Sequence, residues 1–432
     1  MCRLGPSIME RLSHVGTRRG HDGLALERMC REYAVTDSIF LANAPRGYRR
    51  SDKLQDEFLA AAETLRQLDG WPNPNNGGER ELRADLALEG GGVKGVGLVG
   101  AVLALDEAGY RFHRIAGTSA GAVTASIVAG IVQSGADMVT LRATLQSLDF
   151  RRFMPEGKLH EMIGHAAGHF AKVVTDAALL TNREGLYSGD YLDEWLGPVL
   201  HGKLGVKKFG DLVLTPADDP ELGESSSHQY RLVVYTSDLT RARLACLPFD
   251  YVTYGVDPDE QDPVRAVRAS MSVPFYFEPV HFQAREATVE VEGPGGSSAL
   301  VRFPAGEHTW VDGGLLAKFP IHTFDRSDGL SPRWPTIGIK LSQFQTDYST
   351  TSFRESAIAV AVRCLKTMMN EWETVASHHS TVGRTIFVDN IGLSAMDFDL
   401  TPQQLDTLFL NGVEAATKFV IEAARRGGVP RR

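Results

Sequence analysis

The chain has 432 residues, enough for one large domain or two of ordinary size. Hydrophobic residues make up 43% and charged residues 23%, which excludes a disordered protein and provides for a sizeable core. The 45 basic and 54 acidic side chains leave a formal charge of -9, which argues against general affinity for nucleic acid and gives no attraction to anionic membranes.

The cysteines and the apolar stretches indicate the setting in which the protein works. Neither a zinc site nor a disulfide framework is predicted, because the cysteines lie far apart and form no C-x-x-C pair: Cys2, Cys30, Cys246 and Cys364. The simplest interpretation is a reducing, cytosolic setting. The N-terminal MCRLGPSIMERLSHVG has no continuous apolar core, so no secretory signal is expected. No stretch approaches the roughly 20 apolar residues of a membrane span. We therefore expect a cytoplasmic or peripheral protein that meets any lipid from the aqueous side.

Three regions are expected along the chain. Residues 1–84 are predicted to form a helical N-terminal extension, in which segment 51–68 has apolar residues at helical spacing. The run DGWPNPNNGGERE then marks a boundary, because it is rich in turn formers. Residues 85–325 are predicted to be the main domain. Residues 326–432 are expected to add strands and helices that complete or flank it.

From residue 85 the sequence alternates short strands, glycine-rich turns and helices. Leu86-Ala87-Leu88 is a short apolar run before three glycines, and a helical pattern follows that Gly109 can close. Arg114-Ile115-Ala116 is a second short strand, followed by another glycine-containing turn and a helix of small residues. This order is the signature of an α/β fold with a parallel sheet.

Further elements are predicted downstream. Strands are expected at 230–237 and 336–341, with a helix at 263–271. Residues 286–303 alternate between apolar and charged side chains around Pro294-Gly295-Gly296, which predicts a hairpin-like insertion.

The C-terminal part is predicted to hold a helix near 352–378 and a strand at 385–388. Its last helix is well marked, with Thr401 as N-cap, Gln404 three residues into the helix and Gly427 beyond its end.

The strongest motif is Gly117-Thr118-Ser119-Ala120-Gly121, a G-x-S-x-G turn between a strand and a helix. A nucleophilic serine in such a turn needs small neighbours, because its backbone is strained and approaches other elements closely. A helix N-terminus also directs backbone amides at developing negative charge. A small-residue turn that contains serine by chance is the alternative. The strand–turn–helix context favours Ser119 as a nucleophile.

A second motif, Gly90-Gly91-Gly92-Val93-Lys94-Gly95, opens the preceding helix. It matches G-x-G-x-x-G, but a dinucleotide site expects an acidic residue at the end of the next strand, which here ends in Gly117-Thr118-Ser119. A P-loop fails as well, because Lys94 is followed by Gly95 rather than by Ser or Thr. Glycine amides at this helix start suit an oxyanion hole, and a plain tight turn is the alternative.

The third motif is Trp310-Val311-Asp312-Gly313-Gly314. Asp-Gly is a routine turn dipeptide, so alone this stretch indicates only a turn. Beside the other two motifs it gains meaning, because a carboxylate next to a serine hydroxyl can accept its proton without an imidazole between them. Asp312 is therefore the candidate base for Ser119.

In this order, GGGVKG, GTSAG and DGG resemble the three signatures of patatin-like phospholipases. The resemblance covers roughly residues 86–324. The block Ala269-Ser270-Met271-Ser272-Val273-Pro274, followed by Phe277-Glu278-Pro279-Val280, is also similar to a family segment between serine and aspartate. The resemblance implies an α/β patatin-like three-layer sandwich, with a mainly parallel central sheet and helices on both faces. Residues 85–325 would be its catalytic domain.

The resemblance also implies an activity. It predicts a serine acyl-ester hydrolase of the phospholipase A or lysophospholipase type, with Ser119 as nucleophile, Asp312 as base and an acyl-enzyme intermediate. The implied partner is a lipid or another acyl ester, met at a membrane surface or in solution. No nucleic-acid partner is expected. The family works without a metal, so no cofactor is expected. The sequence leaves the oligomeric state open.

The other motif residues take supporting roles by the same resemblance. The oxyanion hole is assigned to the glycine loop: Gly90, Gly91, Gly92, Val93, Lys94 and Gly95. The residues around the nucleophile form its elbow: Gly117, Thr118, Ala120 and Gly121. The residues after the base belong to the aspartate motif: Gly313 and Gly314.

Other interpretations stay open. An α/β-hydrolase with a Ser-His-acid triad also uses G-x-S-x-G, and His322, His378 and His379 lie downstream of Asp312. Motif order favours the dyad, because the serine comes only one βα unit after the glycine loop. A non-catalytic lipid-binding or regulatory module would keep the fold without the activity. The interpretation as a nucleotide-binding protein depends on the glycine loop alone.

The region 150–181 mixes apolar residues with histidines, and it admits two interpretations. It is either a lid or lipid-facing helix that gates the site, or an ordinary amphipathic core helix, which the pattern favours. His165 and His169 share a helical face, but no carboxylate or cysteine pattern accompanies them, so a metal site is not predicted there.

Overall fold

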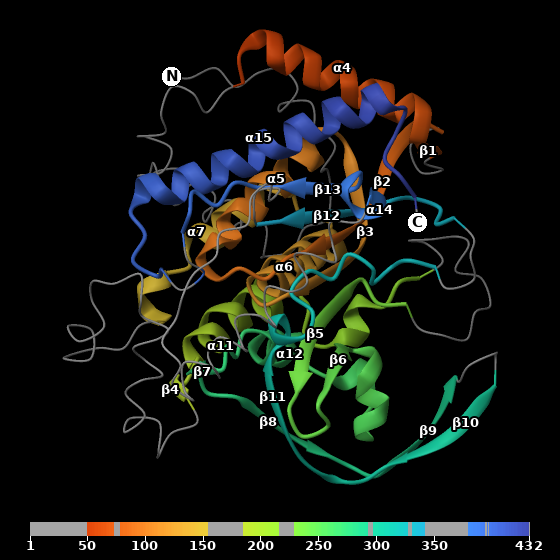
Figure 1. Ribbon diagram of the computed structural model, residues 1–432, viewed down its shortest axis with the longest axis vertical. Helices are drawn as coiled ribbons and strands as arrows, with labels where there is room; N and C mark the ends of the chain where they lie inside the picture. The colour runs from red at the N-terminus through yellow and green to blue at the C-terminus, as the bar shows by residue number, and fades with distance from the viewer. Residues whose placement is uncertain are drawn as a thin grey trace, which may run out of the picture. The chain divides into compact units, whose positions relative to one another are not determined.

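A mixed sheet forms the centre of the fold (Figure 1). The structure is a computed structural model that describes residues 50–72, 78–153, 185–215, 229–292, 297–326, 331–341, 379–393, 395 and 397–431. Within these residues the sheet has nine strands, with the order β13-β12-β2-β3-β5-β11-β8, while β1 pairs with β2 and β6 with β5. All these elements belong to one compact unit, Ser51–Arg432.

The strands of this sheet are β1 (Trp71–Pro72), β2 (Arg80–Leu88), β3 (Tyr110–Thr118), β5 (Leu232–Asp238), β6 (Arg243–Leu247), β8 (Val280–Ala284), β11 (Gly306–Asp312), β12 (Thr336–Lys340) and β13 (Thr385–Phe387). Two further pairs stand apart from it: β4 (Gly185–Tyr187) with β7 (Phe275–Phe277), and β9 (Ala287–Glu292) with β10 (Ser298–Phe303).

The α-helices are α4 (Asp52–Asp69), α5 (Val96–Glu107), α6 (Ala120–Ser134), α7 (Val139–Gln146), α11 (Asp190–Gly197), α12 (Pro263–Ser270), α14 (His379–Val382) and α15 (Pro402–Arg426). Shorter helical turns are η1 (Gly92–Gly95), η2 (Phe150–Phe153), η3 (Pro198–Lys203), η4 (Phe209–Leu212), η5 (Phe249–Tyr254), η6 (Pro258–Glu260) and η8 (Gly313–Leu315).

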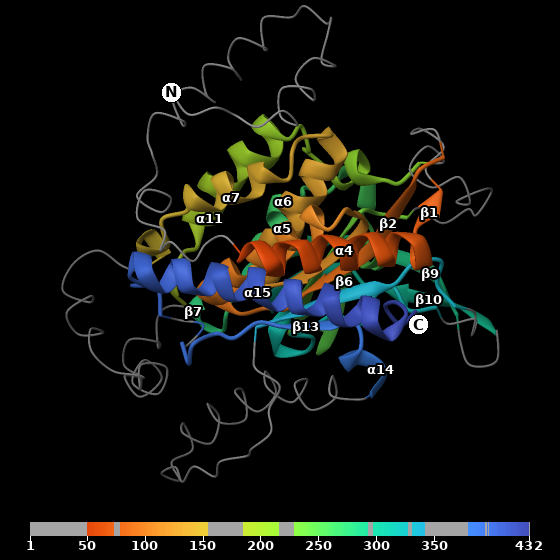
Figure 2. The same cartoon turned by 90° about the horizontal axis from the view of Figure 1, so that it is seen from above.

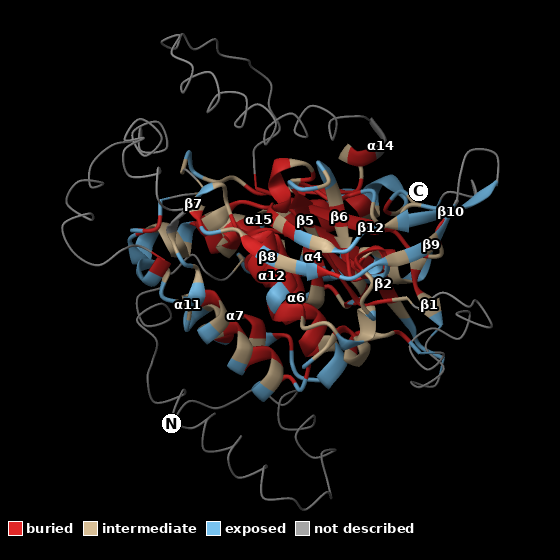
Figure 3. Cartoon of the chain, turned by 90° about the horizontal axis from the view of Figure 1, so that it is seen from below, coloured by how far each residue is buried: buried red, intermediate tan, exposed pale blue. Residues whose placement is uncertain are grey.

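The parallel strands are the most deeply buried part of the sheet. Strands β13, β12, β2, β3 and β5 run parallel, and β11 and β8 continue the sheet antiparallel. All of β12 and most of β2 and β3 are buried (Figure 3). Near-continuous apolar strands of this kind form parallel sheets that are covered on both faces. The predicted α/β sandwich with a mainly parallel central sheet is therefore confirmed.

Helices α4, α5 and α15 pack together beside the sheet, and α4 and α15 lie side by side in both views (Figures 1 and 2). The α5–α15 contact depends on glycine. A Cβ on Gly100 would lie 2.0 Å from the carbonyl oxygen of Phe409, and a Cβ on Gly412 would lie 2.0 Å from that of Gly97. The C-terminal helix is thereby packed closely against the helix that the glycine loop opens.

Other sheet residues are covered by the chain that follows β11. Phe319 and Ile321 pack on Ala87 of β2, and Phe324 packs on Ala116 of β3 and Val233 of β5. This segment connects the aspartate motif to β12, so the residues that follow Asp312 in the chain also cover the sheet.

Several predicted elements are confirmed. The helix over 51–68 is α4, and the hairpin at 286–303 is the antiparallel pair β9–β10. Helix α15 begins after Thr401, which forms a capping box with Gln404, and ends at Gly427 in a left-handed conformation. Strand β3 is longer than the predicted Arg114–Ala116 and extends over Tyr110–Thr118.

Other predictions lie outside the described residues. These are the helix near 352–378, most of the N-terminal extension, and most of the 150–181 region with His165 and His169. Among the helices that the structure describes, none combines the length and apolar character needed to cross a bilayer.

Candidate active site

The register of the central strands brings the three motifs to one edge of the sheet. Strand β5 lies between β3 and β11, with Thr118 paired to Tyr235 and Asp312 paired to Thr236. The ends of β3 and β11 therefore stand at nearly the same level on either side of β5. The glycine loop follows β2, which pairs with β3 on its other side.

Ser119 lies in a strained turn between β3 and α6. Its backbone dihedrals are φ 54° and ψ -125°, which residues with a side chain rarely adopt. Close packing requires both glycines of the pentapeptide. A Cβ on Gly117 would lie 2.3 Å from the carbonyl oxygen of Gly121, and a Cβ on Gly121 would lie 2.3 Å from that of Leu88. Nucleophile elbows have a strained strand-to-helix turn of this kind.

The Ser119 hydroxyl donates a hydrogen bond to the Asp312 carboxylate, with 2.7 Å between Oγ and Oδ2. The exposed fraction is 6% for Ser119 and 1% for Asp312. The other carboxylate oxygen, Oδ1, accepts a hydrogen bond from the Gly314 amide at 2.6 Å. One oxygen is thus fixed by the aspartate motif, and the other faces the serine proton.

Burial raises the pKa of the Asp312 carboxyl from 3.8 to about 6. The hydrogen bonds from Ser119 and Gly314 and the positive charge of Lys318 act in the opposite direction and favour the ionised form. A carboxylate with a raised pKa is a stronger base than an exposed one, and at neutral pH it is still mostly ionised.

The C-terminal end of α12 holds both members of this pair. The Ser270 hydroxyl accepts a hydrogen bond from the Ser119 amide at 2.8 Å. The Ser272 carbonyl accepts one from the Asp312 amide at 2.8 Å. Arg268 donates in turn to the Ser272 hydroxyl. The sequence offered one signal for these residues, the family-like block 269–274, but nothing in that block indicates which atoms they touch.

The amides of the glycine loop fall into two groups. The Gly90 amide donates to the Lys318 carbonyl at 2.9 Å, the Val93 amide to the Ala395 carbonyl at 3.2 Å, and the Lys94 amide to the Gly91 carbonyl at 3.3 Å. Among the described residues, the Gly91 and Gly92 amides form none of these backbone hydrogen bonds.

A buried ion pair lies next to this loop. Glu89, between β2 and the loop, accepts a hydrogen bond from the Leu341 amide and lies 3.6 Å from the Lys318 ammonium. Since the Lys318 carbonyl also accepts the Gly90 amide, the segment after the aspartate motif is tied to the start of the loop.

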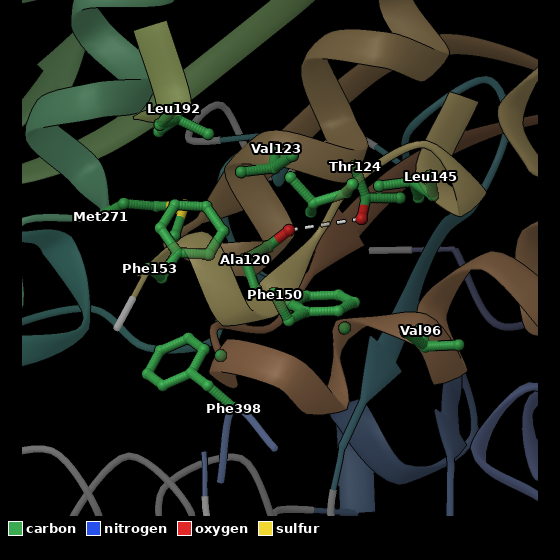
Figure 4. A pocket seen from close by; sticks show the side chains of 13 residues that line it. Val96, Ala120, Val123, Thr124, Leu145, Phe150, Phe153, Leu192, Met271 and Phe398 are labelled. Atoms are coloured by element: carbon green, nitrogen blue, oxygen red, sulfur yellow. Dashed lines mark hydrogen bonds between the residues drawn. The ribbon is translucent and has the colours of Figure 1, made fainter. Parts of the chain in front are cut away.

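An apolar cavity lies beside the elbow and the glycine loop (Figure 4). It touches the elbow at Ala120, the glycine loop at Gly92 and Gly95, and the α12 end at Met271. The other lining side chains are apolar except for one threonine: Val96, Val123, Thr124, Leu145, Leu148, Phe150, Phe153, Leu192 and Phe398. The Thr124 hydroxyl is itself bonded to the Ala120 carbonyl. Such a lining suits a hydrocarbon chain.

The histidines of the alternative triad lie elsewhere. The His322 ring contacts Asp325, with 2.6 Å between Nδ1 and Oδ2, and Asp325 also binds Arg384. His379 begins α14, and His378 lies outside the described residues. Within the part of the chain that the structure describes, no histidine ring contacts Ser119.

The chain was compared with known proteins. The family model for the patatin-like phospholipase matches residues 86–325, more than half of the chain. The uncharacterized protein YqhO of Bacillus subtilis (strain 168) is 30% identical over 322 residues, which are 74% of this chain and 92% of that protein.

Two solved structures are similar at lower identity. VipD from Legionella pneumophila has 15% identity and a TM-score of 0.37, over 78% of this chain and 66% of that one. Human GIVD cytosolic phospholipase A2 has 10% identity and a TM-score of 0.39, over 88% of this chain and 65% of that one. This chain thus spans slightly less than two thirds of their length. On the family model and the identity to the Bacillus protein, the chain belongs to the patatin-like phospholipase family.

Proposed function

We propose that the protein is a serine lipid acyl hydrolase of the phospholipase A or lysophospholipase type. In this proposal Ser119 is the nucleophile and Asp312 its general base. The observation that carries the proposal is the 2.7 Å hydrogen bond from the Ser119 hydroxyl to the buried Asp312 carboxylate. Membership of a family of lipid acyl hydrolases supports the same reaction class.

In the first half of the proposed reaction, Ser119 Oγ attacks the ester carbonyl carbon while Asp312 accepts the hydroxyl proton. The carbonyl oxygen becomes an oxyanion, to which the Gly91 and Gly92 amides donate. The carbon–oxygen bond to the alcohol then breaks, and the protonated Asp312 returns its proton to the leaving alkoxide. The alcohol departs and the acyl group stays on Ser119 as an ester.

In the second half, water attacks the acyl-enzyme. Asp312 accepts one proton of that water, and the same two amides stabilise the second oxyanion. The bond to Ser119 Oγ breaks, and the proton on Asp312 passes to the serine oxygen. The products are a free carboxylic acid and the regenerated hydroxyl, so the cycle needs neither a metal nor a redox partner.

The apolar cavity supports an acyl ester as the substrate. It begins at Ala120, directly after the nucleophile, and at Gly92 of the proposed oxyanion hole. A chain bound there would leave its carbonyl carbon at the serine. Burying a chain in this cavity contributes roughly 0.8 kcal/mol for each methylene group that leaves water.

The proposal also includes the place where the enzyme meets its substrate. Lipid substrates would be met at a lipid–water interface, with the enzyme acting from the aqueous side. The formal charge of -9 gives no general attraction to anionic membranes, so we expect apolar contacts rather than net charge to govern that encounter.

The proposal is tested with a fluorophosphonate probe, which forms a bond to an activated serine oxygen and loses fluoride. Wild type should be labelled and should hydrolyse short-chain esters. Ser119→Ala should show neither labelling nor hydrolysis. In Asp312→Asn the rates of labelling and of ester hydrolysis should both fall by about 10²- to 10⁴-fold, which is the usual contribution of a general base.

Ser126→Ala is the matched control. Ser126 lies on α6, is as buried as the site, and donates its hydroxyl to the Val123 carbonyl. It should keep labelling and turnover. Equal turnover in wild type and Ser119→Ala would contradict the proposal, and an unlabelled, inactive wild type that still binds phospholipid vesicles would favour a binding module instead.

A further inference from the structure

The proposed site has a wall that comes from outside the family-matched region. Residues 395 and 397–400 follow β13 and lead into α15, beyond the end of the match at residue 325. We call them the C-terminal wall. At one end, the Ala395 carbonyl accepts the Val93 amide of the glycine loop. At the other, Phe398 lines the apolar cavity (Figure 4).

The Phe398 ring is held firmly in place. Its exposed fraction is 5%. It stacks on Tyr276, with ring centroids 5.3 Å apart and planes 25° apart, and it lies 5.9 Å from the Phe153 ring. Both neighbours come from other elements, Tyr276 from β7 and Phe153 from η2. Such aromatic pairs add roughly 0.5–1.5 kcal/mol each beyond the area they bury.

The backbone of the C-terminal wall is anchored too. Helix α15 packs against α5 through the close glycine contacts at Gly100 and Gly412. Arg151 and Asp399 form an ion pair at 3.2 Å, but both are exposed, so it contributes little. The wall is therefore positioned by helix packing and by ring stacking rather than by surface charge.

The cavity is lined by the elbow and the glycine loop, at Ala120 and Gly92, and also by Phe398 of the C-terminal wall. An acyl chain that occupies this cavity with its carbonyl carbon at Ser119 therefore meets the Phe398 ring. Since the ring is buried and held by its aromatic neighbours, a longer chain requires that the ring be displaced or removed.

We propose that Phe398 limits the acyl-chain length that the site accepts. This inference rests on the proposed function and deepens it. The other aromatic walls, Phe150 and Phe153, belong to η2 and come from within the family-matched region. Phe398 alone among the aromatic lining residues comes from the C-terminal part, so relatives with a different C-terminal part would differ in this wall.

The test measures kcat/KM for p-nitrophenyl butanoate, octanoate and palmitate with wild type, Phe398→Leu and Phe398→Ala. Phe398→Ala removes a six-carbon ring, so its ratio of octanoate to butanoate should rise at least about tenfold, since one methylene group in an apolar pocket is worth about that much in discrimination. The ratio for Phe398→Leu should lie between those of wild type and Phe398→Ala.

Phe419→Ala is the matched control. Phe419 lies on α15 with an exposed fraction of 6%, close to that of Phe398, and does not line the cavity. Phe419→Ala loses the same ring and a similar amount of stability. Because that ring lies outside the cavity, the ratio of octanoate to butanoate should stay at the wild-type value. Equal ratios in wild type, Phe398→Ala and Phe419→Ala would overturn the inference and leave the proposed function standing.

A binding experiment tests the inference without catalysis. Octanoate and palmitate compete with a fluorescent fatty acid on Ser119→Ala and on Ser119→Ala/Phe398→Ala. Both acids should bind at least about tenfold tighter to the double variant. Unchanged palmitate affinity would overturn the role of Phe398 even if the wild type hydrolysed no ester, a result that would separately contradict the proposed function.

Discussion

The Ser270 hydroxyl accepts a hydrogen bond from the backbone amide of Ser119, at 2.8 Å. Both residues are buried, and Ser119 has a strained backbone. In the proposed mechanism this bond helps to hold the nucleophile in its strained conformation. It makes Ser270 a positioning residue, because its side chain acts through Ser119.

Ser270→Ala should leave this buried amide without an acceptor. The expected cost is about 1–3 kcal/mol in the free energy of unfolding, with a clear loss in kcat because the serine oxygen is less well placed. The midpoint of the pH–rate profile should stay near that of wild type, since Asp312 keeps its contacts. Chemical denaturation and pH-dependent kinetics measure both effects, with Ser126→Ala as control. A normal kcat in Ser270→Ala would refute the positioning role.

The pH dependence of the reaction follows from Asp312. Only the ionised carboxylate accepts the serine proton, and burial raises its pKa to about 6. We therefore expect kcat/KM to increase with pH, with a midpoint near 6, and to level off by about pH 7 to 8. A stopped assay over pH 4.5 to 8 at about constant ionic strength checks this. A midpoint near 4 would mean that the group is not buried during turnover.

Asp312→Asn should lose activity and gain stability. The pKa of Asp312 is raised from 3.8 to about 6 on folding, so the native state binds a proton more tightly than the unfolded state. The stability that this carboxyl contributes is present below about pH 4 and is lost as the pH rises through 6. At pH 8 the amide variant avoids that loss, by up to about 3 kcal/mol.

Thermal unfolding of wild type and Asp312→Asn at pH 4 and pH 8 measures this difference. The variant should have the higher melting temperature at pH 8 and lose most of that advantage at pH 4. A variant that is less stable than wild type at pH 8 would show that the ionised carboxylate stabilises the fold.

Two glycines with positive φ allow a sharp comparison, one in the glycine loop and one at the end of α6. Gly92 has φ +55°, and a Cβ there would lie 1.8 Å from the Ala395 carbonyl oxygen. Gly135 has φ +68°, and nothing lies within 4 Å of its Cβ position. Gly92→Ala should displace the loop and lower kcat by about 10²- to 10³-fold, as the loss of an oxyanion donor does. Gly135→Ala should cost about 1 kcal/mol of stability and leave kcat unchanged.

His322→Ala separates the dyad from the triad. His322 contacts Asp325 and is half exposed, and Asp325 keeps Arg384 as a partner when the imidazole is removed. We expect kcat/KM within about twofold of wild type, because no catalytic proton passes through this ring. Steady-state kinetics on a short-chain ester decide the matter, and a loss of about 10³-fold would make the triad the better account.

The local elements were predictable because their signals are local. Apolar runs, glycine turns and the Thr401 capping box each specify their own backbone, and strands β5 and β12 and helices α5, α6 and α15 lie where these patterns predict them. Strand β2 was predicted only at Leu86–Leu88 but extends over Arg80–Leu88. Strand β3 was predicted too short. Its first half carries Arg111, His113 and Arg114, and Arg114 is accommodated by an ion pair with the buried Asp85.

The candidate site was only partly predictable. The order of three motifs indicated Ser119 and Asp312, although they are 193 residues apart, because each stands in a recognisable short pattern. Ala395 and Phe398 stand in no such pattern, and the family-like block 269–274 that contains Ser270 does not indicate which atoms it touches. Their contacts with Ser119, Val93 and the cavity arise only when α12 and the chain before α15 pack on the sheet. A single sequence contains no local signal for such contacts.

The most direct test of the central claim is to trap the acyl-enzyme. Wild type is mixed with a short-chain ester, quenched in acid within the steady state, digested and analysed by mass spectrometry. We predict an acyl group on the peptide that contains Ser119, at the hydroxyl of that residue, and none in Ser119→Ala. Turnover with the acyl group on another residue, or with no acylated peptide at any quench time in wild type and in Asp312→Asn, would contradict the account.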